Sequence, residues 1–354
     1  MKVDIIIAGF GQGGAQRQCA WLANALAEEG DIEVRLLHFL DGENLPLVNP
    51  EKVEVVRLPT SSLYSLANVT QVARAVRSRR PSVVFSWLHA TDVVVGMARP
   101  FFPGGTRWVV AERDSNYPRN WRYLLRRRIG RHADAIVANS EKGRHYWLGA
   151  GYPGERVHVA NNVLSPGIES APQAARRFDF LYAGRLEVQK NVEVLAEAFC
   201  ILASRRPDLR FGIVGDGGLR GRILEIIASH GVSGRVILES YDPNIMGLFR
   251  SNPTFVNLSR HEGLPNTILE NVACGNRIVA SRIPEHVAVL GEDYPLYATD
   301  YGDPTAVASV LERAAQEDWS RQTLHHAEAR LREMSPERVV GQYMSIFRSL
   351  GEDA

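Results

Sequence analysis

Residues 260–270 read RHEGLPNTILE and join a short apolar stretch to a helical one. The stretch before them, Thr254–Leu258, is apolar enough to be a buried strand, and Asn266–Cys274 has the periodicity of a helix. Arg277–Ala280 follows as another short apolar strand. Strand, loop, helix and strand in succession indicate parallel strands covered by helices on both faces, which is the pattern of an α/β fold.

The same alternation extends in both directions along the chain. In the second half it predicts further strands and helices at Phe178–Tyr182, Val192–Ser204, Arg210–Val214, Leu219–His230 and Val236–Leu238. In the first half it predicts them at Val3–Ala8, Gln16–Glu29, Ile32–Phe39, Val53–Leu58, Val69–Arg79, Ser82–Ser86, Trp108–Ala111 and Ala135–Ala138. Between the halves, Leu164–Arg177 (LSPGIESAPQAARR) is rich in Pro, Ser and Ala without an apolar period, so we expect an interdomain linker there.

A chain of 354 residues is too long for one comfortable hydrophobic core, so two domains are expected. We predict two Rossmann-like lobes, residues 1–165 and 166–335, each a parallel sheet with helices on both faces. The helical stretch Pro336–Leu350 lies past the second lobe's strands, and a helix over 336–354 is expected to complete the first lobe. Ligands of such sheets bind at the carboxyl ends of the strands, so two facing lobes would place one site in the cleft between them.

Charge and composition narrow the function classes. The net charge is +1, with 45% hydrophobic and 23% charged residues, which argues against a nucleic-acid-binding protein that acts through bulk charge. Residues 1–165 carry 21 Lys and Arg against 15 Asp and Glu, whereas the remaining residues carry 20 against 25. A basic first half fits a phosphorylated or membrane-borne partner, or simply a solvated surface.

The cysteines and the hydropathy pattern suggest a cytoplasmic protein. Cys19, Cys200 and Cys274 lie far apart, without the spacing of a zinc site or a disulfide framework. The apolar stretch Val3–Phe10 is too short and too early for the hydrophobic region of a signal peptide. No run of about 18 apolar residues occurs that could span a membrane.

A glycine-rich turn, Gly9–Gly14 (GFGQGG), follows the first predicted strand and matches G-x-G-x-x-G. Glycines let the backbone approach a ligand, and a helix N-terminus offers N–H groups to an anion. Taken alone, the turn suggests an NAD(P)-dependent oxidoreductase. The acidic residue that such a site requires is offered by Asp41, within the loop-like stretch LDGEN. The same glycines could instead form a tight turn with no ligand.

Two further motifs follow strands of the second half. Arg185 and Lys190 come after the strand Phe178–Tyr182, where their planar and point charges could converge on a diphosphate or remain solvated. Glu262 and Glu270 flank a G-L-P turn, with Asn266 or Thr267 as the expected helix N-cap. Backbone N–H groups at this helix N-terminus suit a phosphate, and carboxylates suit sugar hydroxyls.

Together these motifs resemble the retaining family-4 glycosyltransferases, which have the two-lobed GT-B fold. The resemblance is carried by GRLEVQKN (184–191), VGDGG (214–218) and HEGLPNTILENVACG (261–275), with GGAQR (13–17) in addition. It spans nearly the whole chain. The spacing of the two glutamates with the upstream Arg and Lys is specific, whereas the glycine turn is not.

The resemblance implies a role for each matching residue. Arg185 and Lys190 would hold the donor diphosphate, Glu262 would contact the donor sugar, and Glu270 would contact the ribose. Other donor contacts would come from Gly215, Gly217, Gly263, Leu264, Pro265, Asn266 and Thr267. The first-lobe loop near the phosphates or the acceptor would contain Gly13, Gly14 and Gln16.

The sequence departs from the family pattern at two places. Many members carry a first-lobe histidine after a strand, but here Glu112, Arg113 and Asp114 occupy that strand end. His89, after the preceding strand, could substitute or be a structural histidine. The usual glycine after the base-binding strand is also missing from ILESYDPN (237–244).

The resemblance implies transfer of a UDP-linked hexose or N-acetylhexosamine, with retained configuration, to a glycan or lipid-linked acceptor in polysaccharide or lipopolysaccharide biosynthesis. No Asp-x-Asp occurs in the sequence, so no metal and no cofactor are expected. Arg185, Lys190 and helix N-termini would then stabilise the leaving nucleotide. The oxidoreductase hypothesis leaves Arg185, Lys190, Glu262 and Glu270 of the second lobe unexplained. A third hypothesis is a protein that binds a nucleotide sugar without catalysis.

A basic stretch suggests peripheral contact with the inner face of the cell membrane. Pro118–His132 (PRNWRYLLRRRIGRH) combines Trp121 and Tyr123 with six arginines. Family members with lipid-linked acceptors dock such surfaces on anionic membranes, although a solvated helix face has the same composition. Additional basic residues occur nearby in the sequence at Arg74, Arg77, Arg79 and Arg80.

Overall fold

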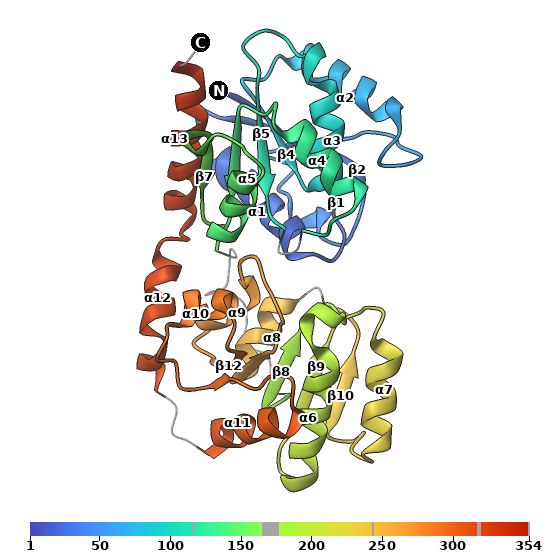
Figure 1. Ribbon diagram of the computed structural model, residues 1–354, viewed down its shortest axis with the longest axis vertical. Coiled ribbons are helices and arrows are strands. Elements are labelled where there is room, and N and C mark those ends of the chain that lie inside the picture. Colours follow the sequence, from blue (N-terminus) through green and yellow to red (C-terminus); the bar gives the residue numbers. More distant parts are fainter. Residues whose placement is uncertain (115–116, 165–176, 243, 317–319, 353–354) are drawn as a thin grey trace. The chain divides into compact units, whose positions relative to one another are not determined.

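A computed structural model describes residues 1–114, 117–164, 177–242, 244–316 and 320–352 (Figure 1). The chain divides into two compact units, Met1–Leu164 with Glu333–Ala354 (unit 1), and Ser165–Arg332 (unit 2). The linker expected at Leu164–Arg177 lies, apart from its two end residues, outside the described residues. Each unit is described by itself.

Unit 1 contains, in its described part, a seven-stranded parallel sheet in the order β3-β2-β1-β4-β5-β6-β7. Its strands are β1 (Lys2–Gly9), β2 (Glu33–Leu40), β3 (Glu54–Arg57), β4 (Val83–Trp87), β5 (Arg107–Glu112), β6 (Ala135–Ala138) and β7 (Val157–Val159). Its α-helices are α1 (Gly14–Glu28), α2 (Leu66–Arg79), α3 (His89–Ala98), α4 (Trp121–Gly130), α5 (Glu141–Gly149) and α13 (Pro336–Glu352). Short 3₁₀ helices are η1 (Leu45–Leu47), η2 (Arg99–Phe101) and η3 (Gly154–Arg156).

The central strands of unit 1 are buried on both faces. Val3, Ile5 and Ile7 of β1 pack in a cluster with residues of α1 and α13, whereas Ile6 packs in a second cluster with residues of α2 and α3. Alternate residues of a strand point to opposite faces, so a strand between two helical layers is apolar throughout. This explains why the sequence showed continuous apolar runs.

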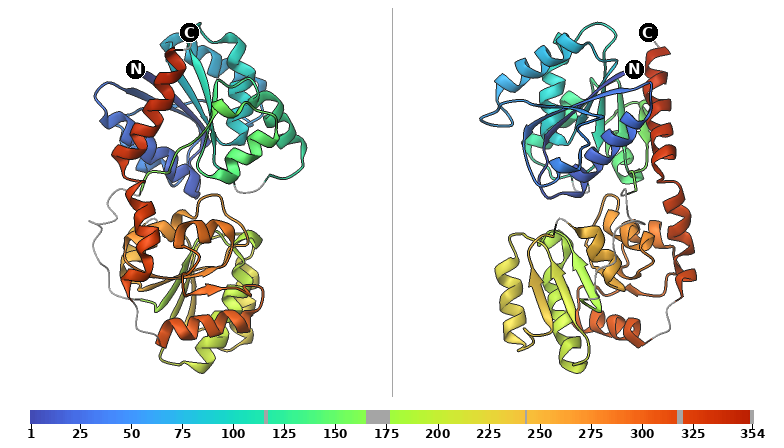
Figure 2. Two further views of the ribbon diagram at one scale, coloured as in Figure 1. Left: turned by 60° about the vertical axis from the view of Figure 1, so that its left-hand side comes forward. Right: turned by 180° about the vertical axis from the view of Figure 1, so that it is seen from behind.

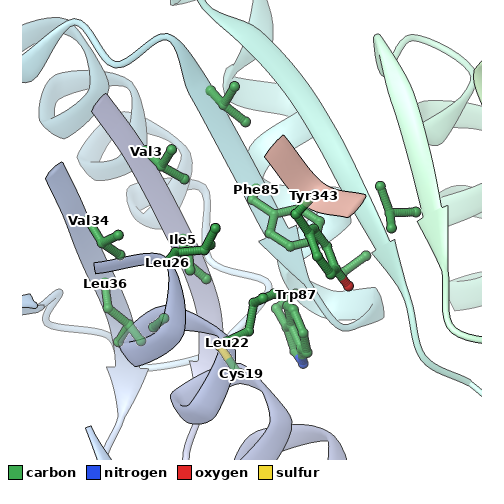
Figure 3. Packing of buried hydrophobic residues seen from close by; sticks show 14 of the residues in the cluster. Val3, Ile5, Cys19, Leu22, Leu26, Val34, Leu36, Phe85, Trp87 and Tyr343 are labelled. Atoms are coloured by element: carbon green, nitrogen blue, oxygen red, sulfur yellow. The ribbon is translucent and has the colours of Figure 1, made fainter. Parts of the chain in front are cut away.

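Helix α13 joins unit 1 although it lies at the far end of the chain. The Tyr343 ring lies tilted against that of Phe85 in β4, with centroids 5.8 Å apart (Figure 3). The Phe347 ring packs edge-on against the same Phe85 ring at 5.7 Å. Both views in Figure 2 show α13 (red) running alongside unit 1. Buried aromatic contacts of this kind hold the C-terminal helix onto the first sheet.

Unit 2 repeats the architecture with a six-stranded parallel sheet, counted over its described residues, in the order β10-β9-β8-β11-β12-β13. Its strands are β8 (Phe180–Ala183), β9 (Phe211–Val214), β10 (Val236–Glu239), β11 (Thr254–Asn257), β12 (Arg277–Ser281) and β13 (Tyr297–Ala298). Its α-helices are α6 (Val192–Arg205), α7 (Arg220–Ser229), α8 (Ile245–Ser251), α9 (Asn266–Ala273), α10 (Pro284–Leu290), α11 (Pro304–Gln316) and α12 (His325–Arg332). The 3₁₀ helices are η4 (Val188–Lys190) and η5 (Arg321–Leu324).

Both sheets reverse their strand order once, which fixes where ligands are expected. The reversal lies between β1 and β4 in unit 1 and between β8 and β11 in unit 2. In open parallel sheets the ligand sits outside the carboxyl ends of the strands at such a point. The predicted α/β class, with two Rossmann-like parallel sheets, is confirmed.

No helix in the described part of the chain is both long and apolar enough to cross a membrane.

Candidate functional site

Two loops at the strand-order reversal of unit 2 bring Lys190 and Glu262 together. Lys190 ends η4, after β8, and Glu262 follows β11. The Lys190 Nζ lies 2.6 Å from Glu262 Oε1, and the two side chains are only 18% and 8% exposed. Ser259 Oγ donates to the same Oε1 at 2.6 Å. Within the described residues, Oε2 is therefore the oxygen left to accept a ligand hydroxyl, and Lys190 retains two N–H groups for phosphate oxygens.

Glu262 is held as a carboxylate despite its burial. Burial is the largest influence and by itself favours the neutral acid. The charge of Lys190, with the hydrogen bonds from Lys190 and Ser259, outweighs burial and holds the pKa of Glu262 below its ordinary value. A charged acceptor is thus present at neutral pH.

The buried His286 is linked to the Glu262 loop by hydrogen bonds through Ser281. Burial lowers the pKa of His286 to about 4, so the ring is neutral. Its Nδ1 lies 2.8 Å from the Ser281 carbonyl oxygen, which assigns the proton to Nδ1. Ser281 Oγ in turn donates to the Ser259 carbonyl at 2.6 Å. The sequence analysis did not identify Ser259, Ser281 or His286, because the spacing of Ser281 and His286 does not relate them to Glu262.

Arg185 lies in the same β8 loop as Lys190 and faces solvent. Its side chain is 51% exposed and pairs with Glu187 at 3.0 Å. The buried Tyr182 hydroxyl donates to the Arg185 carbonyl oxygen at 2.8 Å, which fixes the backbone and leaves the guanidinium accessible. Such an exposed pair is weak, so a diphosphate could displace Glu187.

Gly215 and Gly217 are required by the packing of this loop. Both have positive φ, 148° and 158°. A Cβ on Gly215 would lie 2.0 Å from the Gly184 carbonyl oxygen, and one on Gly217 would lie 2.5 Å from that of Leu186. The two glycines therefore let the β9 loop support the backbone around Arg185. Their contact with a nucleotide stays a prediction.

Asn266 is the first residue of helix α9 and therefore does not lie at its N-cap position. Pro265 occupies the N-cap position without a side-chain hydrogen bond, so the expected cap by Asn266 or Thr267 is wrong. Backbone bonds replace it, from Asn266 N to Leu264 O at 2.9 Å and from Ile268 N to Pro265 O at 3.0 Å.

The start of α9 and its one buried acidic side chain lie next to the Glu262 loop. Gly263–Thr267 leads into the helix, whose N-terminus carries partial positive charge and no side-chain cap. Glu270 lies one turn further along, 2% exposed. The structure thus puts Lys190 and Glu262 in direct contact, Arg185 on the loop of Lys190, and Glu270 on the helix after Glu262.

The glycine turn of unit 1 is occupied by the loop after β2. Asn44 donates its backbone N–H to Phe10 O at 2.9 Å, and a Cβ on Gly42 would lie 2.3 Å from that oxygen. Asp41 pairs with Arg57 at 3.2 Å. In a dinucleotide-binding fold this region receives the ribose, so these contacts disfavour the oxidoreductase alternative.

Helix α1 begins directly after the same turn and has no side-chain cap at its N-terminus. Gly13 is its N-cap and makes no side-chain capping bond. The Gln16 carboxamide folds over Gly13, since a Cβ there would lie 2.0 Å from Gln16 Oε1. Gly14 is the first helical residue. The turn can therefore offer backbone N–H groups and one amide to an anion.

His89 begins α3, at the carboxyl end of β4. Its ring stacks on Tyr123 with centroids 5.5 Å apart and an interplanar angle of 16°. Burial, the largest influence, lowers its pKa. The Tyr123 hydroxyl donates to Asp114 Oδ2 at 3.1 Å. Tyr123 therefore contacts His89 through its ring and Asp114 through its hydroxyl.

Arg126 lies at the centre of a buried acidic cluster. Its guanidinium, fully buried, lies 2.7 Å from Asp92, 2.9 Å from Glu112 and 3.1 Å from Asp114. Burial raises the pKa of Asp92 to about 6 and of Glu112 to about 7. Arg126, one of the six arginines predicted to form a basic surface, is therefore buried, and the prediction is wrong for this residue.

No group of three or more His, Cys, Asp or Glu side chains arranged to hold a metal ion occurs in the described ranges.

Comparison with known proteins gives matches along both units. The model described as glycosyl transferases group 1 matches residues 177–317, and the glycosyl transferase 4-like domain matches residues 13–162. The lipopolysaccharide core biosynthesis glycosyltransferase LpsE of Rhizobium meliloti (strain 1021) is 26% identical over 343 residues, covering 94% of this chain and 93% of the relative.

A second relative comes from Campylobacter jejuni subsp. jejuni serotype O:2 (strain ATCC 700819 / NCTC 11168). It is the GalNAc-alpha-(1->4)-GalNAc-alpha-(1->3)-diNAcBac-PP-undecaprenol alpha-1,4-N-acetyl-D-galactosaminyltransferase, 24% identical over 373 residues and covering 98% of each chain. Among solved structures, Anabaena Alr3699/HepE in complex with UDP and glucose superposes with a TM-score of 0.82 at 17% identity, covering 99% of this chain and 100% of that one. Since the two family models match successive units and the fold is shared over the whole chain, this chain belongs to the group 1 (family 4) glycosyltransferases with the GT-B fold.

Proposed function

We propose that this glycosyltransferase moves a hexose or N-acetylhexosamine from its UDP-linked form to a glycan or lipid-linked acceptor, with retained anomeric configuration, in polysaccharide or lipopolysaccharide biosynthesis. The carrying observation is the Lys190–Glu262 pair at the strand-order reversal of unit 2, with one carboxylate oxygen left for a ligand. Relatives named for lipopolysaccharide core synthesis and for an undecaprenol-linked glycan, and the UDP complex of a fold neighbour, support the substrate class.

The donor side of the reaction follows from the charges in unit 2. The bond between the anomeric carbon and the β-phosphate oxygen breaks, and negative charge grows on the departing UDP. Lys190 and Arg185 would stabilise that charge, while Glu262 Oε2 accepts from a donor-sugar hydroxyl and Glu270 from the ribose. Gly215, Gly217 and the α9 N-terminus would complete the donor contacts.

The acceptor side would use unit 1. The acceptor oxygen bonds to the anomeric carbon on the face that UDP leaves, and its proton passes to the departing phosphate oxygen, so no protein base is assigned. Gly13, Gly14 and Gln16 at the uncapped N-terminus of α1, with His89 at the start of α3, would contact the acceptor or the phosphates.

We propose that this chemistry requires no metal ion and no cofactor. The absence of Asp-x-Asp in the sequence supports this, together with two cationic side chains and two uncapped helix N-termini, those of α1 and α9. These groups supply the positive charge that a divalent cation would otherwise supply.

The proposed location is the cytoplasmic face of a membrane, bound peripherally. Trp121 and Leu124 of α4 are 59% and 62% exposed, and Arg122 lies over the Tyr64 and Trp121 rings at 5.6 Å from each. Aromatic and cationic side chains of this kind suit a lipid interface, and each Arg near anionic lipid contributes about 1 kcal/mol. Sedimentation with phosphatidylglycerol vesicles at low salt should retain the protein, and release of a Trp121→Ala variant supports this face.

The test of the proposed function is transfer from UDP-hexoses and UDP-N-acetylhexosamines to lipid-linked or free glycan acceptors, with the product anomer read by NMR. An α-linked product from an α-linked donor is expected. Arg185→Met should lose most turnover. Arg206→Met should not, because Arg206 pairs with Asp208 at the C-terminal end of α6. An inverted product, or full activity of Arg185→Met, contradicts the proposal.

A further inference from the structure

The two loops that carry Lys190 and Glu262 are tied together by their neighbours as well as by the pair itself. The Arg260 backbone N–H donates to Gln189 O at 2.9 Å, and the Gln189 side-chain amide donates to His261 O at 3.0 Å. These bonds flank the Lys190–Glu262 contact in both segments, so the loops run side by side for two to three residues.

Asn191 adds side-chain hydrogen bonds to the backbone contacts between the two loops, and these bonds to Arg260 are called the tie. It adopts φ 55° and ψ 35°, a left-handed conformation in which asparagine is among the tolerated residues. Its side chain is buried, and it does not cap the helix α6 that follows. Instead Oδ1 accepts from Arg260 Nε at 3.2 Å and from Arg260 Nη2 at 3.1 Å, while Nδ2 donates to Tyr301 O at 2.7 Å.

The arrangement matters at the moment when a donor binds. Lys190 must then share its N–H groups between Glu262 and the incoming phosphates, which weakens the direct contact between the loops. The Arg260–Asn191 bonds do not involve Lys190 and therefore persist. Catalytic groups misplaced by about 1 Å lose on the order of a hundredfold in rate, so a tie independent of the ligand has a kinetic consequence.

We propose that Arg260 and Asn191 are positioning residues that hold Lys190 against Glu262 so that both side chains meet one donor. The proposal rests on the proposed function for Lys190 and Glu262 and adds the residues that keep them in register. Two of the five guanidinium N–H groups of Arg260 are directed at Asn191, and through these bonds Arg260 is proposed to act on Lys190.

Two substitutions remove the Arg260–Asn191 bonds, and Asn191→Gly also removes the bond to Tyr301 O. Arg260→Met keeps the aliphatic stem without its donors, and Asn191→Gly keeps the left-handed backbone without the amide. Each should lower kcat/KM for the donor roughly tenfold to a hundredfold. The double variant should be no worse than the poorer single variant, because either substitution alone already removes the Arg260–Asn191 bonds. Arg206→Met is the matched control and should match the wild type.

The background of Lys190→Met separates positioning from direct contact. In that background Arg260→Met should cost less than about twofold further, since its target is gone. A full further loss would show that Arg260 acts on the donor itself or on the whole unit, and it would overturn the proposal. Arg260→Lys should recover part of the loss, because an ammonium can still donate to the Asn191 amide oxygen.

Hydrogen exchange provides a readout that needs no activity. Exchange of the amides at 189–191 and 260–262 should rise in Arg260→Met and Asn191→Gly, with exchange in β9 unchanged. Unchanged exchange in both segments overturns the tie whatever the kinetics show. If exchange rises but neither the wild type nor any variant transfers sugar, the proposed function fails and the tie between the loops remains.

Discussion

Replacing Lys190 by Met tests the buried pair most severely. The two side chains are 18% and 8% exposed, so removing the ammonium leaves a buried carboxylate whose remaining hydrogen-bond donor, among the residues that the structure describes, is the Ser259 hydroxyl. Breaking a buried pair costs about 3–5 kcal/mol, and the partial exposure of Lys190 favours the lower end. At about 2–4 °C per kcal/mol for a unit of this size, the Tm of unit 2 should fall by about 6–12 °C.

A second substitution shows whether the loss comes from the stranded charge. Lys190→Met with Glu262→Gln leaves a neutral amide that still accepts from Ser259, so most of the stability should return. Turnover should not return, because the cation for the leaving phosphate is absent, a loss of about 2.7–4 kcal/mol by analogy with other charge-stabilising donors.

The pH dependence of this series has a definite sign. In the wild type the depressed pKa of Glu262 contributes stability above the ordinary carboxyl pKa, and that stability is lost as the pH falls through the depressed value. In Lys190→Met the hydrogen bond from Ser259 remains but the charge of Lys190 is gone, so burial should outweigh it and raise the pKa of Glu262. The variant's deficit in stability should therefore be largest near neutral pH and shrink towards pH 4.

Differential scanning calorimetry of the wild type, both single variants and the double variant, at pH 4 and 7, gives the coupling directly. An unchanged Tm in Lys190→Met at pH 7 would refute the reasoning. A double variant no more stable than Lys190→Met would refute it equally.

Three further predictions follow from the described contacts. Gly217→Ala should lower both Tm and turnover, because its Cβ would lie 2.5 Å from Leu186 O, whereas Gly218→Ala, with no atom within 4 Å, should change neither; equal effects would contradict the packing role. The pKa of Glu112, raised by burial from 4.5 to about 7, should make unit 1 lose stability as the pH rises from about 4.5 to 7, and Glu112→Gln should flatten that slope in urea unfolding. Transfer activity should survive EDTA to within about twofold, since cationic side chains replace the metal charge; recovery that depends on added Mg²⁺ would contradict this.

Individual strands and helices with a clear local apolar pattern are the part of the fold that the sequence predicts best. Ala135–Ala138 is predicted with its observed bounds, and Val192–Ser204 differs from α6 by one residue, because their apolar patterns are local. Helix α3 was not predicted, because most of His89–Ala98 is buried and the segment lacks the polar face that marks a helical period. The three-residue strand β7 was missed because pairing with β6, and no local pattern, defines it.

The candidate site was predictable where residues share one loop. Glu262 and Glu270 lie on one loop and helix, so their spacing was informative. The direct contact of Lys190 with Glu262, 72 residues apart, depends on the pairing of β8 with β11 and could not be read from spacing. Arg126 looked like a surface cation for the same reason, because its partners lie on other elements of unit 1.

Binding of a donor at the Lys190–Glu262 pair is the central claim, and a thermal-shift screen tests it most directly. UDP-, GDP- and ADP-sugars are offered to the wild type and to the Lys190→Met, Glu262→Gln double variant, which should remain folded. We expect a UDP-sugar to raise the Tm of the wild type most, since a ligand that binds only the native state stabilises it. We expect this shift to be lost in the double variant. An equal shift in both proteins, or no shift with any nucleotide sugar, would contradict it.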